Sequence, residues 1–304
     1  MHSLLVSIGG TGSTVLQRLI TINYYLEDVK VQNTHDLVNK FLYHNEKQVV
    51  QRNGKIQYGQ TLEEVMSVLE TSNKNTMLVS RLSKDHLDVR KDDVKTTENF
   101  IEFVKKFYTK NIACMRDNVF EFAMSLAIKK ESKIYNIFTN DQRKVVENVK
   151  KVDEQFFISQ CKKYIEYHEW LDNYFPKIIK ISYEDVINKS DEVLQNITGY
   201  RNTLTRYFGL PTSELLRLDH KKNLTNYEYK ALELYKNLCD QLIKDKIFNE
   251  MPIKNTSLQD KKNQIENFDR CKKIFDQYTR KIDFIDTSIT NFDPWNKKYV
   301  DNVS

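Results

Sequence analysis

Short apolar runs alternate with helical patterns over the first two thirds of the chain. The runs are typical of buried strands, and they predict strands at Leu4–Ile8, Val29–Asn33, Met77–Ser80, Asn111–Met115 and Ile178–Ser182. Between them, apolar residues recur at helical spacing and predict helices at Leu62–Leu69, Phe100–Phe107, Phe120–Lys129 and Phe156–Tyr174. Strands that alternate with helices favour an α/β fold, in which helices flank a central parallel sheet.

A hairpin signal interrupts this alternation. Asn53 and Gly54 separate two short runs within Val49–Tyr58, and Asn-Gly between such runs is typical of a two-residue hairpin turn. We interpret the hairpin, at about residues 48–58, as an excursion from the sheet. It serves either as a lid over a site or as surface decoration.

The final third of the chain carries only helical patterns. Apolar residues recur at helical spacing in two stripes, formed by Tyr227, Ala231, Leu234, Leu238 and Leu242 and by Ile265, Phe268, Cys271, Phe275, Tyr278 and Ile282. Both stripes predict helices whose apolar faces pack into the core. We therefore expect an α/β core at residues 1–197 and a helical C-terminal extension at residues 198–304 that packs on it.

Composition narrows the possible function classes. Of the 304 residues, 40% are hydrophobic and 12% aromatic, enough for a full core and too many for a disordered chain. No apolar stretch approaches the ~20 residues that a membrane helix needs, and the start lacks the features of a signal peptide. These observations predict no membrane span and a cytoplasmic location.

Charge and cysteine usage exclude further classes. The net charge of +5 is mild and spread along the chain, whereas nucleic-acid binders concentrate basic residues in a patch. We expect no nucleic-acid partner, and the charge suits a small anionic ligand. The four cysteines lie far apart without a C-x-x-C pair, so the sequence predicts neither a zinc site nor disulfides. No metal is expected.

Glycine is scarce in this chain, yet three of its seven glycines, Gly9, Gly10 and Gly12, fall within four positions. A predicted strand precedes them, and Ser13 and Thr14 begin a predicted helix. Glycines let the backbone approach a ligand closely, and the first N–H groups of a helix attract anions. The segment therefore predicts a phosphate-binding loop. The alternative is a tight turn in which Ser13 or Thr14 is an ordinary helix cap.

The loop is not a Walker A motif. That motif places a lysine directly before its Ser/Thr, and this chain has Gly12 before Ser13. A nucleoside triphosphate would lack its main phosphate cation, which disfavours ATP. An ATP-dependent small-molecule kinase and a non-catalytic nucleotide-binding scaffold remain as alternative functions.

Three markers, taken together, resemble a known family. The strand followed by G-T-G-S-T-x-L-Q-R is similar to the 5′-phosphosulfate loop of sulfotransferases that use 3′-phosphoadenosine 5′-phosphosulfate (PAPS). Arg116 ends a later predicted strand and Ser125 follows nine residues on, in a segment that reads F-E-x-A-x-S as in bacterial and phage members. Tyr183-Glu184-Asp185-Val186 resembles the family's Y-E-D-L segment.

The resemblance implies a P-loop-type fold and transfer of a sulfuryl group from PAPS to a hydroxyl of a carbohydrate or other small acceptor, without a metal. The product nucleotide would be 3′-phosphoadenosine 5′-phosphate (PAP). The resemblance implies that Arg116 and Ser125 bind the 3′-phosphate and that the loop holds the phosphosulfate through Gly9, Gly10, Thr11, Gly12, Ser13 and Thr14.

The residues alone leave other roles open for Arg116 and Ser125. Arg116 follows a strand of a parallel sheet, at the edge where such sheets bind ligands, but it could instead form a salt bridge to Asp117 or Glu121. Ser125 could be a small residue at a helix contact.

One departure from the family pattern concerns the loop cation. Many members have Lys or Arg where this chain has Gly10, and that cation stabilises charge on the departing phosphate. Arg81 and His86 are the nearest candidates to replace it and to contact the substrate. Otherwise catalysis would be impaired.

The acceptor hydroxyl must lose a proton, so a general base is expected. Asp36 stands where bacterial relatives place their acid, just beyond the second predicted strand, and His35 is its neighbour. Histidine has the more suitable ordinary pKa near neutrality. The alternative is that Thr34 caps a helix with Asp36 in its first turn.

Overall fold

The computed structural model of the protein describes residues 2–34, 36–38, 50–52, 55–57, 61–71, 75–88, 92–134, 140–218, 221, 223–245, 247 and 261–282. Within them the chain forms two compact units. Unit 1 comprises Met1–Met115 and Tyr174–Asn249, and unit 2 comprises Arg116–Asn173 and Glu250–Ser304. The predicted boundary at residue 198 stays a prediction.

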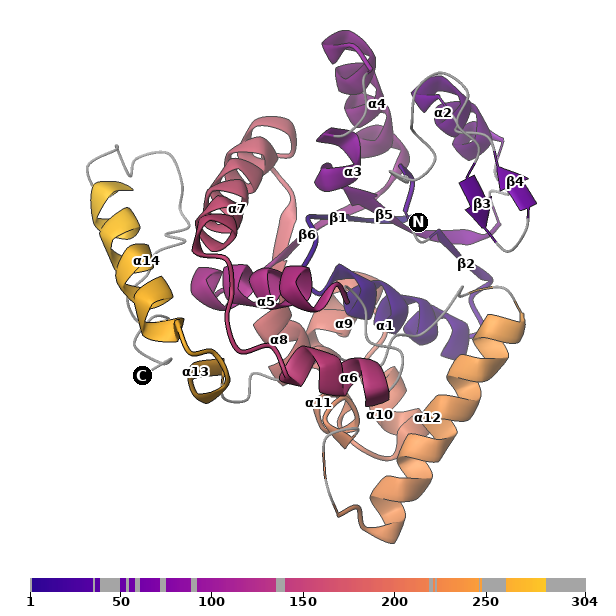
Figure 1. The fold of residues 1–304 in the computed structure, drawn as a ribbon. Coiled ribbons are helices and arrows are strands. Elements are labelled where there is room, and N and C mark those ends of the chain that lie inside the picture. Colours follow the sequence, from indigo (N-terminus) through magenta and orange to yellow (C-terminus); the bar gives the residue numbers. More distant parts are fainter. Residues whose placement is uncertain are drawn as a thin grey trace. The chain divides into compact units, whose positions relative to one another are not determined.

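A five-stranded parallel sheet lies at the centre of unit 1 (Figure 1). Its strand order is β2-β5-β1-β6-β7. The strands are β1 (Ser3–Ser7), β2 (Val31–Thr34), β5 (Met77–Ser83), β6 (Lys110–Met115) and β7 (Ile179–Ser182). All five predicted strands are confirmed, and so is the α/β fold with a central parallel sheet.

The position of β1 explains its sequence and locates the candidate site. Each of its residues is buried, as expected for a central strand of a parallel sheet that is covered on both faces. It pairs with β5 on one side and β6 on the other. The carboxyl ends of these three strands therefore share one edge, from which the chain continues into the glycine loop, into α3 (Lys84–Asp88) and, after β6, into Arg116.

Helices cover the sheet of unit 1. The helix α1 (Ser13–Leu26) packs on β1, β2 and β5 and contacts α9 (Ser190–Thr198) and α10 (Thr203–Phe208). The helices α2 (Leu62–Glu70) and α4 (Val94–Phe107) pack on each other. The unit also contains α8 (Tyr183–Asn188), α11 (Thr212–Leu215) and α12 (Asn226–Lys244).

The predicted hairpin is present. The strands β3 (Val50–Arg52) and β4 (Lys55–Gln57) pair antiparallel in a sheet of their own. The turn residues Asn53 and Gly54 lie outside the described residues. The choice between lid and surface decoration stays open.

Unit 2 is helical. It contains α5 (Val119–Ser132), α6 (Asn140–Glu147), α13 (Lys261–Gln264), α14 (Phe268–Ile282) and nearly all of α7 (Glu154–Tyr174). Phe120, Phe157, Phe268 and Phe275 form its aromatic core, with edge-to-face contacts whose ring centroids are 5.1–6.5 Å apart. Such contacts add specific geometry to apolar burial, and here they fix α14 against α5 and α7.

Polar contacts hold the C-terminal part of unit 2 in register. Asn267 accepts from the Val152 N–H at 3.1 Å and donates to the Val152 carbonyl at 2.9 Å. Gln264 donates to the carbonyls of Val146 and Val149. The place of α13 is therefore set by residues more than 100 positions earlier in the chain.

The first predicted stripe of the final third is only partly correct. Ala231, Leu238 and Leu242 of α12 are buried, but Tyr227 is 55% exposed and Leu234 is 38% exposed. Tyr227 lies in the first turn of α12 and donates its hydroxyl to the Gly209 carbonyl at 2.6 Å. Its polar end therefore stays at the surface, and the core-facing stripe is narrower than predicted. None of the described helices is long and apolar enough to cross a membrane.

Candidate functional site

The glycine loop has the geometry of a turn that ends in an open helix terminus. Gly10 and Gly12 have φ values of 94° and 76°, in the left-handed region that favours glycine. Gly12 is the N-cap of α1, and no side chain in the described part of the chain caps this end. Thr11 instead donates its hydroxyl to the Ile8 carbonyl at 2.9 Å. The alternative of an ordinary Ser/Thr cap therefore does not describe α1, and phosphate binding stays a prediction.

The backbone at Gly10 explains the missing loop cation. At a φ of 94° an L-residue such as lysine would be strained, because its Cβ crowds the backbone. Any cation that serves the loop would therefore have to come from another residue.

The third sequence marker lies against the first. A Cβ added at Gly12 would lie only 2.2 Å from Tyr183 Cδ2, so the ring of Tyr183 packs directly on the loop. Tyr183 begins α8, which Ser182 caps by accepting from the Asp185 N–H at 3.0 Å. Any side chain at Gly12 would displace this ring as well as strain the loop.

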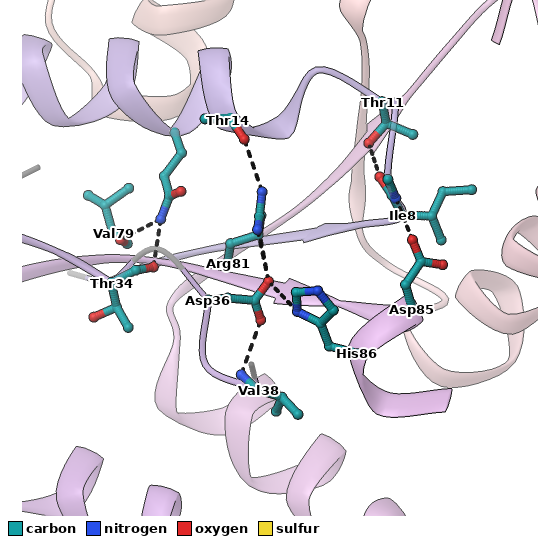
Figure 2. Close-up of polar contacts among 12 residues, drawn as sticks. Ile8, Thr11, Thr14, Thr34, Asp36, Val38, Val79, Arg81, Asp85 and His86 are labelled. Atoms are coloured by element: carbon teal, nitrogen blue, oxygen red, sulfur yellow. Dashed lines mark hydrogen bonds and ion pairs between the residues drawn. The ribbon is translucent and has the colours of Figure 1, made fainter. Parts of the chain in front are cut away.

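Four predicted site residues form one polar network in unit 1 (Figure 2). Arg81 donates from its guanidinium to Thr14 Oγ1 at 3.0 Å and to Asp36 Oδ2 at 3.0 and 3.1 Å. His86 Nδ1 lies 3.0 Å from the same carboxylate oxygen. The other oxygen of Asp36 accepts from the Val38 N–H at 3.1 Å. The structure thus brings Thr14, Asp36, Arg81 and His86 together.

Arg81 brings a cation to the first turn of α1, where it contacts Thr14. It lies within β5, where it pairs with Leu5 of β1. Through Thr14 its guanidinium reaches the end of the helix that attracts anions. Its role as a substitute for the loop cation stays a prediction.

The geometry separates the roles of the acid and the histidine. The Asp36 side chain is only 1% exposed, while those of Arg81 and His86 are 13% and 15% exposed. A buried carboxylate that already contacts two side chains and a backbone N–H is poorly placed to take a proton from a substrate. It lies close enough to His86 Nδ1, at 3.0 Å, for its charge to stabilise a protonated ring, although the two groups are not hydrogen-bonded.

Two further predictions concern the segment that follows β2. Thr34 ends β2, and residues 36–38 are not helical, so Asp36 does not lie in the first turn of a helix. His35 lies outside the described residues. Its role as a base stays a prediction.

The sequence analysis missed an acid at the start of the loop. Asp85 in α3 accepts from the Gly9 N–H through Oδ2 at 2.7 Å. Nothing in the local pattern indicated this contact, because it joins residues 76 positions apart.

Arg116 and Ser125 lie in unit 2. The backbone of Arg116 is held by the Tyr164 hydroxyl, which accepts from the Arg116 N–H at 2.7 Å and donates to the Arg116 carbonyl at 2.6 Å. Ser125 Oγ accepts from Lys261 Nζ at 2.8 Å, and Lys261 also forms an ion pair with the buried Glu121. Ser125 thus lies beside a lysine and its carboxylate partner.

These residues belong to a cluster of cations that influence one another. The pKa of Lys129 is lowered from 10.5 to about 8, mainly by burial and further by the charges of Arg116 and Lys261. A lowered lysine pKa means that the surroundings disfavour the ammonium form. Arg116, Ser125, Lys129, Lys261 and Glu121 are called the cationic cluster below.

Sequence reasoning could have found one of the two additional lysines. Lys129 follows Ser125 by four positions on the same helix, and such residues share a face. Lys261 comes from a part of the chain that carries no motif, so only the fold reveals it.

Comparisons with known proteins do not assign the chain to a family. No family model and no curated protein matches this chain. Within the described residues, no group of three or more His, Cys, Asp or Glu is placed to hold a metal ion.

Proposed function

We propose that the protein is a sulfotransferase that uses PAPS to sulfate a hydroxyl of a carbohydrate or other small acceptor. The observation that carries the proposal is the cationic cluster. The two residues that the resemblance assigns to the 3′-phosphate, Arg116 and Ser125, lie with Lys129 and Lys261 in this cluster. A phosphate beside them would stabilise cations that now repel one another.

The glycine loop is the proposed site of the 5′-phosphosulfate. The N-terminus of α1 begins at Ser13 without a side-chain cap, and such a terminus favours anions. Arg81 would neutralise the charge that develops on the 5′-phosphate as it departs, replacing the lysine that Gly10 cannot supply. Thr14 already accepts from Arg81, so its own hydroxyl hydrogen is left to donate to a ligand oxygen.

His86 is the base that the geometry favours. Its Nδ1 lies 3.0 Å from Asp36 Oδ2 but makes no hydrogen bond there, so Asp36 would act on the ring through its nearby charge, and Nε2 is the proposed proton acceptor. PAPS supplies an activated sulfuryl group. The acceptor oxygen bonds to sulfur while the bond from sulfur to the 5′-phosphate oxygen breaks, and that oxygen keeps the electron pair. His86 Nε2 takes the hydroxyl proton, and the nearby Asp36 carboxylate offsets the positive charge that the ring gains.

A matched pair of nucleotides tests the proposal. PAP and AMP differ only in the 3′-phosphate, so their affinities isolate the cationic cluster. A charge-assisted contact is typically worth about 1.5–3 kcal/mol, and we expect PAP to bind at least tenfold more tightly than AMP in isothermal titration.

The other outcomes are equally informative. Equal affinities for PAP and AMP would contradict the proposal, and tight binding of ATP in that case would support the kinase. Tight binding of PAP without sulfation of any hydroxyl compound in a broad screen with labelled PAPS would support the non-catalytic scaffold.

A further inference from the structure

The glycine loop carries a negative charge at its first residue. Asp85 Oδ2 accepts from the Gly9 N–H at 2.7 Å, and a Cβ added at Gly9 would lie 3.1 Å from the same oxygen. Figure 2 shows the Asp85 side chain reaching from α3 to the loop, beside the segment where Thr11 bonds Ile8. An acid therefore occupies one N–H of a loop whose proposed ligand is itself an anion.

Such an acid affects anions unequally. Repulsion between like charges grows with the charge on the ligand, so a carboxylate at the loop penalises a doubly charged group more than a singly charged one. The loop N–H groups and the α1 terminus attract both. The balance therefore depends on the charge of the group nearest the carboxylate.

Sulfate and phosphate ends of a nucleotide differ in this respect. Both are tetrahedral and of similar size, so a pocket distinguishes them poorly by shape. A terminal phosphate carries up to two negative charges at neutral pH, because its second pKa is about 6. A sulfuryl group linked through one oxygen has a single ionisable position and carries one charge. Charge is the property that separates them.

We propose that Asp85 is a specificity-determining residue that makes the loop prefer a sulfate-terminated nucleotide over a phosphate-terminated one. This inference rests on the proposed function and deepens it. It supplies a reason why a loop that binds phosphosulfate would reject the abundant nucleoside diphosphates and triphosphates. The same repulsion weakens the hold on the 5′-phosphate of PAP, which gains a second charge when sulfur leaves.

The experiment uses adenosine 5′-phosphosulfate and ADP, which differ only in their terminal group. Both lack a 3′-phosphate, so the measurement does not depend on the cationic cluster. We expect the wild-type protein to bind adenosine 5′-phosphosulfate about tenfold more tightly than ADP in isothermal titration. In Asp85→Asn the amide oxygen can still accept from the Gly9 N–H, and we expect the preference to shrink at least fivefold, chiefly through tighter binding of ADP.

A matched control lies one turn away. Asp88 belongs to the same short helix, is exposed and pairs with Lys84. Asp88→Asn removes the same charge from α3 without touching the loop, and it should leave the preference unchanged. An equal response of both variants would mean that the general field of α3 acts, which overturns the assignment to Asp85.

The remaining outcomes each decide the matter. If Asp85→Asn weakens the binding of both nucleotides equally, Asp85 only anchors Gly9 and the inference is wrong. A wild-type protein that binds ADP as tightly as adenosine 5′-phosphosulfate also overturns it. If PAP still binds more tightly than AMP in those cases, the proposed function stands and only the inference about Asp85 is wrong. If PAP and AMP also bind with equal affinity, both the proposed function and the inference about Asp85 are wrong.

Discussion

Asp36 has an almost fully buried side chain and Lys129 is partly buried, and the charges around these two ionisable groups differ in sign. Asp36 contacts Arg81, His86 and a backbone N–H, so opposite charge and hydrogen bonds compensate its burial. Lys129 is influenced by two further cations, Arg116 and Lys261. A buried charge is tolerated only when it is paired. The first group is part of a completed network, whereas the second is an arrangement that an added anion would stabilise.

The difference suggests that the two groups of residues have different functions. A compensated network holds its members in fixed positions, which suits a carboxylate that must offset charge on a base. A repelling cluster stores unfavourable energy that a bound phosphate releases, which suits recognition of charge. Single substitutions in each group test whether they differ in this way.

The largest effect is expected at the completed network. His86→Asn removes the proposed proton acceptor and should lower kcat by about 10²–10⁴-fold, while the affinity for PAP stays near the wild-type value. Asp36→Asn should lower kcat by about 10²-fold through the loss of the negative charge that offsets the protonated ring. Turnover of any acceptor found with labelled PAPS, together with PAP titration, measures both.

His35 provides the opposing arm of that experiment. If His35→Asn reduces kcat while His86→Asn does not, the base is His35 and the assignment to His86 is wrong. If neither histidine matters and Asp36→Asn abolishes turnover, the carboxylate itself acts as the base.

An intermediate effect is expected at Lys261. Lys261→Met removes a cation that contacts Ser125, and we expect PAP to bind about tenfold more weakly while AMP is unaffected. Lys262 is the next residue on α13, is exposed, and offers a matched control as Lys262→Met. An equal loss of PAP affinity in the two variants would show that Lys261 acts only through the general field.

Removing Lys261 also leaves Glu121 buried without its ion-pair partner. A combined Lys261→Met and Glu121→Gln variant restores neutrality at this point. It should regain thermal stability and still bind PAP weakly, which separates recognition from folding.

The smallest effect is the uptake of part of a proton. The pKa of Lys129 is about 8 in the folded protein, against an ordinary value of 10.5, and a phosphate beside it should raise this pKa again. Between those values the complex then holds more protons than the free protein, so PAP affinity should fall as the pH rises from about 8 toward 10.5.

The measurement is titration of PAP at several pH values in buffers of different ionisation enthalpy. Above pH 8 we expect uptake of a large fraction of a proton per site, and much less at pH 7. Lys129→Gln should remove the uptake. Lys130→Gln should keep it, because Lys130 is more exposed and pairs with Asp153. Uptake that persists without Lys129 would assign the proton to another group.

How much the sequence reveals follows from the range of each signal. The buried runs of β1, β5 and β6 carry their own pattern, because a strand covered on both faces is apolar throughout. The glycine loop and the hairpin are likewise encoded by neighbouring residues. Arg116 and Ser125 were singled out by a family resemblance that lies within one strand and the following helix, and their role stays a prediction.

The missed contacts all join distant segments. Asp85 reaches Gly9 across 76 positions, and Lys261 reaches Ser125 across 136. Tyr183 was singled out as a marker, but its packing on Gly12 depends on where α8 docks. Such contacts result from the tertiary fold, and no local periodicity reports them.

The sequence separation between Lys261 and Ser125 also sets the delay between their synthesis on the ribosome. A ribosome adds about 5–20 residues per second, so the 136 positions between them correspond to roughly 7–27 s of synthesis. Until then α5 presents Ser125 and Glu121 without their lysine. The cationic cluster is therefore among the last features that a newly made chain can assemble, long after β1 and the glycine loop have left the ribosome.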